Sequence, residues 1–436
     1  MRKPPTIPSV ACSLSKMDWI RNRLETFANR TACIEAGREW TYADLLQLID
    51  EAASELPPGR RQVIEIDCHS TIEGLATLLA IAESKHIALP LPPDLPLSER
   101  ERMRSAAACS PLYAKLENSG LVLFSSGTSG EPKGMLHNFD ALLRRYQNLK
   151  TRQDRSLLLL LIDHIGGLDS AFRCLFAGST LVIPEARTPD DASRAIARYH
   201  VNVLPASPTF LNLMLLSHVH EKYDLSSVEI IAYGAESMPM AVLRRLGEIF
   251  PYAQLQQKFG TSETGAIRVK SAGNKSLFFR IDDPETQWKV VESELWLKTP
   301  SRIIGYINVG NNSLESEGWY RTGDLVESDE RGYLRIVGRL NEIINVGGQK
   351  VHPNEVAQVI QSIPDIQAVR VFGEDDPISG SRVCAKIITE SLIKPLAWKR
   401  IVRSHCRGKL APWKIPSRID IGRELDVTTR LKQSAQ

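Results

Sequence analysis

Along most of the chain, short apolar runs alternate with stretches in which apolar residues recur at helical spacing. Short apolar runs typical of buried strands recur, namely "QVIEI" (62–66), "LVLF" (121–124), "SLLLLLI" (156–162), "STLVIP" (179–184) and "IIAYG" (230–234). After the last of these, the apolar residues of "SMPMAVLRRLGEIFP" (237–251) fall on one face of a helix. A strand, a turn and then a helix, repeated along the chain, predict an α/β architecture.

The pattern changes near residue 293. Short strand-like runs with turns, "SELWLK", "GWYRTGDLV" and "GYLRIVGR", indicate a small β subdomain. After Arg339 a separate unit begins, in which "VHPNEVAQVIQSIP" has helical spacing and "AVRVFG", "RVCAKII" and "KIPSRIDI" resemble strands, with a further helix expected around 395–407. We therefore predict a large α/β N-terminal domain (1–340), with two αβ layers and the β subdomain, and a small α+β C-terminal domain (341–436).

Composition narrows the class of protein. With 436 residues, 43% of them hydrophobic, the chain can bury more than one core. A formal net charge of +3 lacks the basic excess of a nucleic-acid binder. The longest aliphatic run, 157–162, is too short to span a membrane, and the N-terminus lacks the apolar core of a signal peptide. Seven scattered cysteines fit neither a disulfide framework nor a zinc site, and we expect them to be buried. A cytoplasmic protein is the expectation.

The stretch "SSGTSGEPKG" (125–134) follows an apolar run and is rich in glycine and hydroxyl groups. Glycines such as Gly127 and Gly130 allow several backbone N–H groups to point at one anion. Lys133 adds a positive charge, and side-chain hydroxyl donors come from Ser125, Ser126, Thr128 and Ser129. The segment is suited to a polyphosphate, although its spacing is not that of a Walker motif and a solvated loop is the alternative.

Five ordered motifs resemble those of the adenylate-forming (ANL) superfamily, which includes acyl- and aryl-CoA synthetases. The first is the decapeptide just described, and the others are "YGAESMP" (233–239), "FGTSETG" (259–265), "GWYRTGDL" (318–325) and "GRLNEIINVGGQKVHPNEV" (338–356). The early position of the loop suggests a compact form similar to o-succinylbenzoate-CoA ligase. The resemblance implies a large adenylation domain and a small mobile C-terminal lid domain.

The resemblance also implies roles for individual residues. Glu263 would hold Mg²⁺, Asp324 would bind the ribose hydroxyls, and Arg339 would contact phosphate or ribose. The remaining nucleotide-binding positions would be Ala235, Glu236, Phe259, Gly260 and Ser262. Considered alone, each residue has an ordinary alternative, such as a turn-capping aspartate or a solvated surface charge. The ordered set favours the functional interpretation.

Further implied elements lie towards the C-terminus. Asn341 takes the place of the hinge residue, and Gly347 and Gly348 would line a pantetheine tunnel, although a Gly-Gly pair is also a common turn. The tail "ELDVTTRLKQ" (424–433) resembles the family's ending in that Thr428 and Lys432 keep their places, but three neighbouring positions differ. Lys432 is therefore either the catalytic lysine or a solvated one.

The implied reaction uses ATP and Mg²⁺ to convert a small-molecule carboxylic acid into an acyl-AMP with release of pyrophosphate. The acyl group then passes to a thiol, with CoA as the expected acceptor. Two alternatives remain open: a stand-alone enzyme that loads the phosphopantetheine arm of an acyl carrier protein, and a catalytically weak nucleotide-binding homologue.

The residues expected beside the acid disfavour an α-amino acid. His164 lies where the family has an aromatic or histidine next to the reacting carboxylate. The next position, which is an aspartate in amino-acid-activating domains, is Ile165, and a buried ammonium without a carboxylate partner would be costly. A shift of two residues would instead bring in Asp163. Aryl and acyl acids are not separated by this reasoning.

Overall fold

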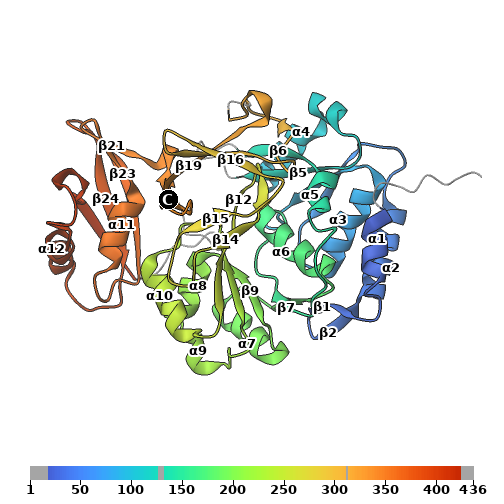
Figure 1. Ribbon diagram of the computed structural model, residues 1–436, viewed down its shortest axis with the longest axis horizontal. Coiled ribbons are helices and arrows are strands. Elements are labelled where there is room, and N and C mark those ends of the chain that lie inside the picture. Colours follow the sequence, from blue (N-terminus) through green and yellow to red (C-terminus); the bar gives the residue numbers. More distant parts are fainter. Residues whose placement is uncertain (1–17, 126–131, 311–312, 424–436) are drawn as a thin grey trace, which may run out of the picture.

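The computed structural model describes residues 18–125, 132–310 and 313–423, and it confirms the mixed α/β class with a large N-terminal and a smaller C-terminal domain (Figure 1). In the described part of the chain, the largest sheet has the strand order β11 (Gln254–Gln257), β10 (Ile230–Tyr233), β9 (Val203–Ala206), β7 (Arg155–Leu157), β8 (Thr180–Ile183), β1 (Thr31–Glu35), β2 (Arg38–Thr41). All neighbours are parallel except β1 and β2. The strands β8, β9 and β10 are short apolar runs, whereas the strands at the two edges of the sheet, β11 and β2, carry mainly polar residues.

A second sheet carries the N-terminal part of the predicted phosphate loop. Its order is β18 (Gly305–Tyr306), β6 (Lys133–Asn138), β5 (Gly120–Ser125), β4 (Ile87–Leu91), β3 (Val63–Asp67). The strands β3, β4 and β5 are parallel, whereas β6 runs antiparallel to β5 and pairs Lys133 with Ser125. The loop between β5 and β6 therefore begins and ends at the same edge of the sheet.

The helices of the large domain form the layers around these two sheets. One hydrophobic core lies among the helices α1, α2, α3, α5 and α6, and a second lies among α7, α8 and α10. Their bounds are α1 (Asp18–Glu25), α2 (Tyr42–Glu55), α3 (Ile72–Ser84), α4 (Leu97–Ala108), η1 (Pro111–Lys115), α5 (Phe139–Arg144), α6 (Ile165–Phe176), α7 (Pro189–Tyr199), α8 (Pro208–Leu216), α9 (Val219–Lys222) and α10 (Met240–Ile249).

The predicted β subdomain is an antiparallel sheet with the order β14 (Val269–Ser271), β15 (Phe279–Ile281), β20 (Leu334–Arg339), β19 (Tyr320–Ser328), β17 (Glu294–Lys298), β16 (Gln287–Val291). A short hairpin, β12 (Phe259–Thr261) and β13 (Gly265–Ile267), connects the largest sheet to this one. Two 3₁₀ turns, η2 (Ser316–Gly318) and η3 (Leu340–Glu342), flank β19 and β20. The hairpin thus lies where the layers of the large domain meet.

The C-terminal domain stands apart at one end of the molecule (Figure 1). Its sheet has the order β22 (Gln349–Val351), β21 (Ile344–Val346), β24 (Gly380–Ile388), β23 (Ala368–Asp376), and β25 (Arg418–Gly422) pairs with β24. The helices α11 (Pro353–Gln361) and α12 (Pro395–Cys406) and the turn η4 (Pro412–Lys414) complete it. It has its own core, centred on the buried Trp398. The boundary between the two domains at residues 340 and 341 stays a prediction.

Two local expectations differ from the structure. Only Ser156 and Leu157 of the apolar run 156–162 belong to a strand, β7, because the chain turns after it to begin α6, and Leu158 and Leu159 are buried without strand structure. Cys109 is exposed rather than buried, whereas the other described cysteines are buried and unpaired. Among the described residues, no helix has both the length and the apolar character needed to cross a bilayer.

Candidate active site

A cleft of about 1220 Å³ opens at the carboxyl ends of the parallel strands in the largest sheet. Ligands of open α/β sheets bind at such ends. A second cleft of about 370 Å³ adjoins it, because Ala235, Phe259, Gly260 and Arg339 line both. The larger cleft contains the predicted phosphate and acid positions, and the smaller one contains the predicted nucleoside positions. We call them the reaction cleft and the nucleoside cleft.

Both ends of the phosphate loop reach the reaction cleft. Ser125 ends β5 and Lys133 begins β6, and both line the cleft. Asn308 fixes the exit of the loop, since its amide oxygen accepts a hydrogen bond from Gly134 N at 2.9 Å and its Nδ2 donates to Pro132 O at 2.7 Å. The predicted loop residues Ser126, Gly127, Thr128, Ser129 and Gly130 lie outside the described residues.

Glu263 lies between the hairpin strands β12 and β13 and faces the reaction cleft. The Tyr306 hydroxyl donates a hydrogen bond to Glu263 Oε1 at 2.8 Å. Burial and the negative charge of Glu263 raise the pKa values of both Tyr306 and Tyr320 above their ordinary range, so both hydroxyls stay protonated as donors. The two tyrosines hold the carboxylate in place, and nothing in the sequence pattern singled them out.

The donor set at Glu263 fits Mg²⁺. A carboxylate that accepts hydrogen bonds from tyrosine still has lone pairs for a cation, because its two oxygens offer about four acceptor positions. Mg²⁺ prefers such oxygen ligands and keeps several waters together with substrate phosphates. Glu263 lines the same cleft as Ser125 and Lys133, where those phosphates are expected.

His164 is the N-terminal cap of α6, and its ring also faces the site. Its Nδ1 accepts a hydrogen bond from Gly166 N at 3.3 Å, and its Nε2 lies 3.4 Å from Ser262 Oγ. Because Nδ1 acts as an acceptor, the proton of the neutral ring is on Nε2 and is directed towards Ser262. Ile165 lines the cleft, whereas the buried Asp163 is not among its described lining residues. Of the two positions considered in the sequence, only Ile165 is among the lining residues of the cleft.

The nucleoside cleft is shaped by backbone. Ala235 has a positive φ of 69° at the turn after β10, and Glu236 accepts a hydrogen bond from Thr209 N at 3.2 Å. Gly260 has φ of 154°, and a Cβ there would lie 2.3 Å from Gly265 O. Phe259 packs against Phe279 with ring centroids 5.2 Å apart. The predicted positions Ala235, Glu236, Phe259 and Gly260 all line this cleft.

Asp324 and Arg339 lie opposite each other on the paired strands β19 and β20. Arg339 Nε donates to Asp324 Oδ1 at 3.0 Å, which leaves the other carboxylate oxygen available. Burial raises the pKa of Asp324, although the charge of Arg339 opposes this effect. A buried carboxylate with one such partner suits a ligand that donates hydrogen bonds, such as a diol.

The C-terminal predictions divide into two groups. Asn341 lines the reaction cleft within η3. Gly347 and Gly348 form the exposed turn between β21 and β22, with φ values of 57° and 82°, and they lie outside the lining described for the reaction cleft. Lys432 lies outside the described residues. In this arrangement the structure brings the hinge position, but not the glycine pair, to the site.

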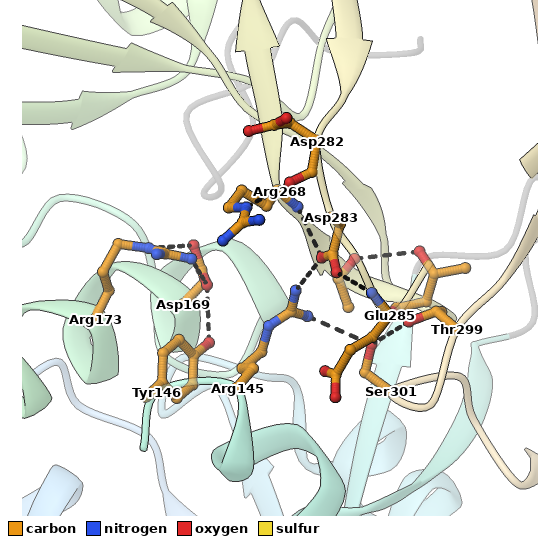
Figure 2. Close-up of polar contacts among 12 residues, drawn as sticks. Arg145, Tyr146, Asp169, Arg173, Arg268, Asp282, Asp283, Glu285, Thr299 and Ser301 are labelled. Atoms are coloured by element: carbon orange, nitrogen blue, oxygen red, sulfur yellow. Dashed lines mark hydrogen bonds and ion pairs between the residues drawn. The ribbon is translucent and has the colours of Figure 1, made fainter. Parts of the chain in front are cut away.

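A polar network that sequence reasoning missed includes two residues that line the reaction cleft, Asp169 and Arg173 (Figure 2). Asp169 of α6 forms an ion pair with Arg173 at 3.0 Å and accepts a hydrogen bond from Tyr146 at 2.8 Å. Burial opposes ionisation of Asp169, but the surrounding donors, with Arg173 foremost, hold the pKa of its carboxyl below the ordinary value. Arg145 lies 3.4 Å from Asp283. These residues are spread from position 145 to position 283, so the sequence pattern did not predict that they would lie together.

Comparison with known proteins is consistent with this geometry. Residues 109–306 match the model of the AMP-binding enzyme family, and residues 355–432 match that of the AMP-binding enzyme C-terminal domain. The chain belongs to this family of adenylate-forming proteins.

Relatives with curated names are CoA ligases. Indoleacetate–CoA ligase of Aromatoleum aromaticum is 26% identical over 482 residues, which is 92% of this chain and 93% of that protein. The 2-succinylbenzoate–CoA ligase of Bacillus subtilis is 29% identical over 70% of this chain and 65% of its own length. Probable CoA ligase CCL5 of Humulus lupulus is 30% identical over 62% of this chain. The chain spans only about half of the length of this last relative, 54%.

Solved structures share the fold over nearly the whole chain. The amide bond synthetase McbA from Marinactinospora thermotolerans superimposes with a TM-score of 0.81 at 23% identity, covering 96% of this chain and 98% of that one. The anthranilate CoA ligase AuaEII, solved with anthranoyl-AMP, has a TM-score of 0.82 at 20% identity and covers 96% of this chain and 95% of its own. At this identity the likeness establishes the fold.

Proposed function

We propose that this protein activates a carboxylic acid with ATP and Mg²⁺ as an acyl-AMP and transfers the acyl group to a thiol, with CoA as the acceptor. The observation that carries the proposal is the convergence in one cleft of Ser125 and Lys133, Glu263 and His164. The adjoining nucleoside cleft adds Asp324. These groups supply the phosphate, metal, acid and ribose positions that such a reaction needs.

In the first half-reaction, a carboxylate oxygen of the acid forms a bond to the α-phosphorus of ATP. The bond from that phosphorus to the bridging oxygen breaks, and pyrophosphate leaves. Lys133, the loop residues and Lys432 reduce the repulsion between the two anions and align them. Glu263 would hold Mg²⁺, which neutralises phosphate charge when bound. His164 packs against the reacting carboxylate, and Asp324 with Arg339 orients the ribose.

In the second half-reaction, a thiolate attacks the acyl carbon and AMP leaves as the mixed anhydride breaks. The thiol proton is lost to solvent or to a base. Gly347 and Gly348, which lie outside the described cleft lining in this arrangement, would line the thiol tunnel only after the C-terminal domain turns about Asn341. Their small size would let a narrow pantetheine arm approach the backbone.

The acid is not an α-amino acid on this proposal. Ile165 lines the cleft where an ammonium would need a carboxylate. Asp169 also lines the cleft, but Arg173 already pairs with it. The names of the relatives include an indoleacetate, a 2-succinylbenzoate and an OPC-8:0 ligase, so aryl and acyl acids both belong in the test.

Carboxylate-dependent ATP–pyrophosphate exchange tests the proposal. A panel of aryl, short-chain, long-chain and amino acids is assayed with the unaltered protein, Lys432→Ala and the exposed-lysine control Lys275→Ala. We expect exchange with one class of acid, its loss in Lys432→Ala and its retention in Lys275→Ala. Nucleotide binding without exchange for any acid would favour a catalytically weak homologue instead.

The acceptor is tested separately by competition. The acyl-AMP is formed first, and equimolar CoA and phosphopantetheinylated acyl carrier protein are then added together. We expect acyl-CoA as the main product. Preferential loading of the carrier protein would contradict this part of the proposal and leave adenylate formation intact.

A further inference from the structure

The acid side of the reaction cleft runs between helix α6 and one face of the largest sheet. On the sheet side, alternate residues of three adjacent strands line it, namely Val203, Pro205, Ile230, Ala232 and Gln256. On the helix side, the lining residues are Gly166, Asp169, Ser170 and Arg173. The cleft therefore extends from the carboxyl ends of the strands, where the reaction takes place, towards their amino ends. A substrate acid in this space has its distal part beside the deeper residues.

Positive charge exceeds negative charge along this part of the cleft. Five basic side chains line it, Lys150, Arg152, Arg173, Lys258 and Arg268, against the two carboxylates of Asp154 and Asp169. An apolar acid would gain nothing from such a lining, because each cation that it covers loses water without gaining a partner. An anionic group would gain charge-assisted hydrogen bonds.

The two carboxylates are already engaged. Asp169 pairs with Arg173, and Asp154 lies 3.6 Å from Arg152. In the part of the chain that the structure describes, Lys258 Nζ contacts the amide oxygen of Gln256 at 3.4 Å, and no carboxylate lies within ion-pair distance of it. Arg268 donates through Nε to the carbonyl of Asp282 at 2.5 Å, and its guanidinium points away from the Asp283 carboxylate towards α6 (Figure 2).

Lys258 follows β11 at its carboxyl end, directly before the hairpin that carries Ser262 and Glu263, and it lines the nucleoside cleft as well as the reaction cleft. Its Nζ turns back along the strand to the side chain of Gln256, which lines the deeper part of the reaction cleft. Its side chain is exposed to the open cleft, but protein surrounds it on most sides. This enclosure, together with the charges of Arg173 and Arg152, lowers the pKa of its ammonium to about 8. An anion bound beside Lys258 would relieve this repulsion.

We propose that the acid activated by this protein carries a second anionic group, remote from the reacting carboxyl group, and that Lys258 and Arg268 bind it. A dicarboxylic acid is the simplest such substrate, and a sulfonate or phosphonate offers the same chemistry. This inference rests on the proposed adenylating function and specifies its substrate class. Lys258 would then determine which acid is bound. It would not be a catalytic residue, because it contacts the distal end of the acid and not the reacting atoms.

The test compares matched acids in the pyrophosphate-exchange assay at saturating ATP. Pairs of mono- and dicarboxylic acids of equal length, aromatic and aliphatic, are assayed with the unaltered protein, Lys258→Met, Lys258→Arg and the control Lys270→Met on the exposed strand β14. We expect the unaltered protein to prefer the diacid in kcat/KM. Lys258→Met should lower the diacid-to-monoacid ratio by about tenfold or more, the size expected for a lost charge-assisted hydrogen bond. Lys258→Arg should restore the ratio, and Lys270→Met should leave it unchanged.

The outcomes separate this inference from the function on which it rests. If monoacids support exchange and are preferred, or if Lys258→Met leaves the ratio unchanged, the second anionic group is excluded and adenylation stands. If no acid supports exchange, the proposed function fails. An independent measure is then the rise in melting temperature that the diacid alone causes in the unaltered protein and in Lys258→Met. An equal rise in the two proteins would overturn the role of Lys258. Sulfonate and phosphonate analogues of the best diacid identify the kind of anion.

Discussion

Asp324 illustrates at the scale of one residue how a binding group can be unfavourable for folding. Its carboxylate is almost fully buried, and burial raises its pKa despite the partner Arg339. A raised carboxyl pKa means that the folded state holds the proton more tightly than the unfolded state does. Ionised Asp324 therefore disfavours the folded state above the ordinary aspartate pKa, and this effect is absent at lower pH.

Replacing Asp324 by asparagine should weaken nucleotide binding without loss of stability. We expect ATP affinity, measured by calorimetry, to fall by about tenfold or more, because a charge-assisted hydrogen bond contributes about 1.5–3 kcal/mol. The melting temperature at pH 7 should stay the same or rise. The exposed Asp94→Asn is the control and should change neither quantity. A marked drop in melting temperature with ATP affinity unchanged would show that Asp324 is structural.

The pH dependence of the diacid reaction should report Lys258. Burial lowers the pKa of its ammonium to about 8, with further lowering by the charges of Arg173 on α6 and Arg152 before β7 and an opposing effect of Asp169 on α6. Lysine binds an anion only when protonated, so kcat/KM for a diacid should be highest below pH 8 and fall as the pH rises through that value. The fall should be weaker for a monoacid and absent in Lys258→Arg, whose guanidinium stays charged. Parallel profiles for the two acids would argue against the assignment.

At the scale of elements, the hairpin β12–β13 unites three functions. Its first strand begins at Phe259 in the nucleoside cleft, and its turn carries Ser262 and Glu263 to the reaction cleft. The turn is held by Ser301 Oγ, which donates to Thr264 O at 2.7 Å. A change in the path of this hairpin would displace nucleotide, metal and acid positions together.

Gly260→Ala should therefore abolish exchange. The new Cβ would lie 2.3 Å from Gly265 O on the partner strand, so the hairpin must open. We expect a loss of about 100-fold in kcat/KM for exchange, since displacements of about 1 Å have effects of this size. Gly273→Ala is a matched control, with φ of 151° and no atom within 4 Å of the new Cβ. It should be destabilised by about 1 kcal/mol yet remain active. Equal activity of the two variants would contradict the role given to the hairpin.

At the scale of the whole molecule, two hydrogen bonds join the two domains at described residues far apart in the sequence. Asn354 Nδ2 donates to Ser237 Oγ at 3.1 Å, and Asn212 Nδ2 donates to Gln367 O at 3.1 Å. The C-terminal domain has its own core and follows the short η3 turn at Asn341. A separate core and a short connection allow a domain to change its orientation as a unit.

A reversible crosslink between Ser237→Cys and Asn354→Cys should block one half-reaction. The variant is made in a chain without Cys12 and the exposed Cys109 and joined by a bis-methanethiosulfonate reagent. We expect the crosslink to abolish one of the two activities, exchange or acyl-CoA formation, and to leave the other intact when the two are assayed separately. Reduction should restore both, and each single-cysteine variant should be unaffected by the reagent. Retention of both activities in the crosslinked protein would exclude a required reorientation.

The local parts of the site could be predicted from the sequence because they depend on neighbouring residues. The strand before Ser125, the polar loop after it and the small residues around Gly260 are contiguous, and their order along the chain identifies the family. The change of pattern after Arg339 likewise predicted a smaller C-terminal domain. The apolar run 156–162 was harder, since a buried loop and a buried strand have the same composition.

The sequence by itself determined the α/β class, the order of the nucleotide-binding motifs and the positions of Glu263, His164 and Asp324 within them. Only the tertiary structure decided which of the cleft's charges are already paired. Asp169 forms an ion pair with Arg173 four residues away on α6, whereas Lys258, which lies between β11 and β12, has no described carboxylate within ion-pair distance. Pairing depends on distance in space, and residues separated by about ninety positions in the chain become neighbours only when the sheet and helix pack together.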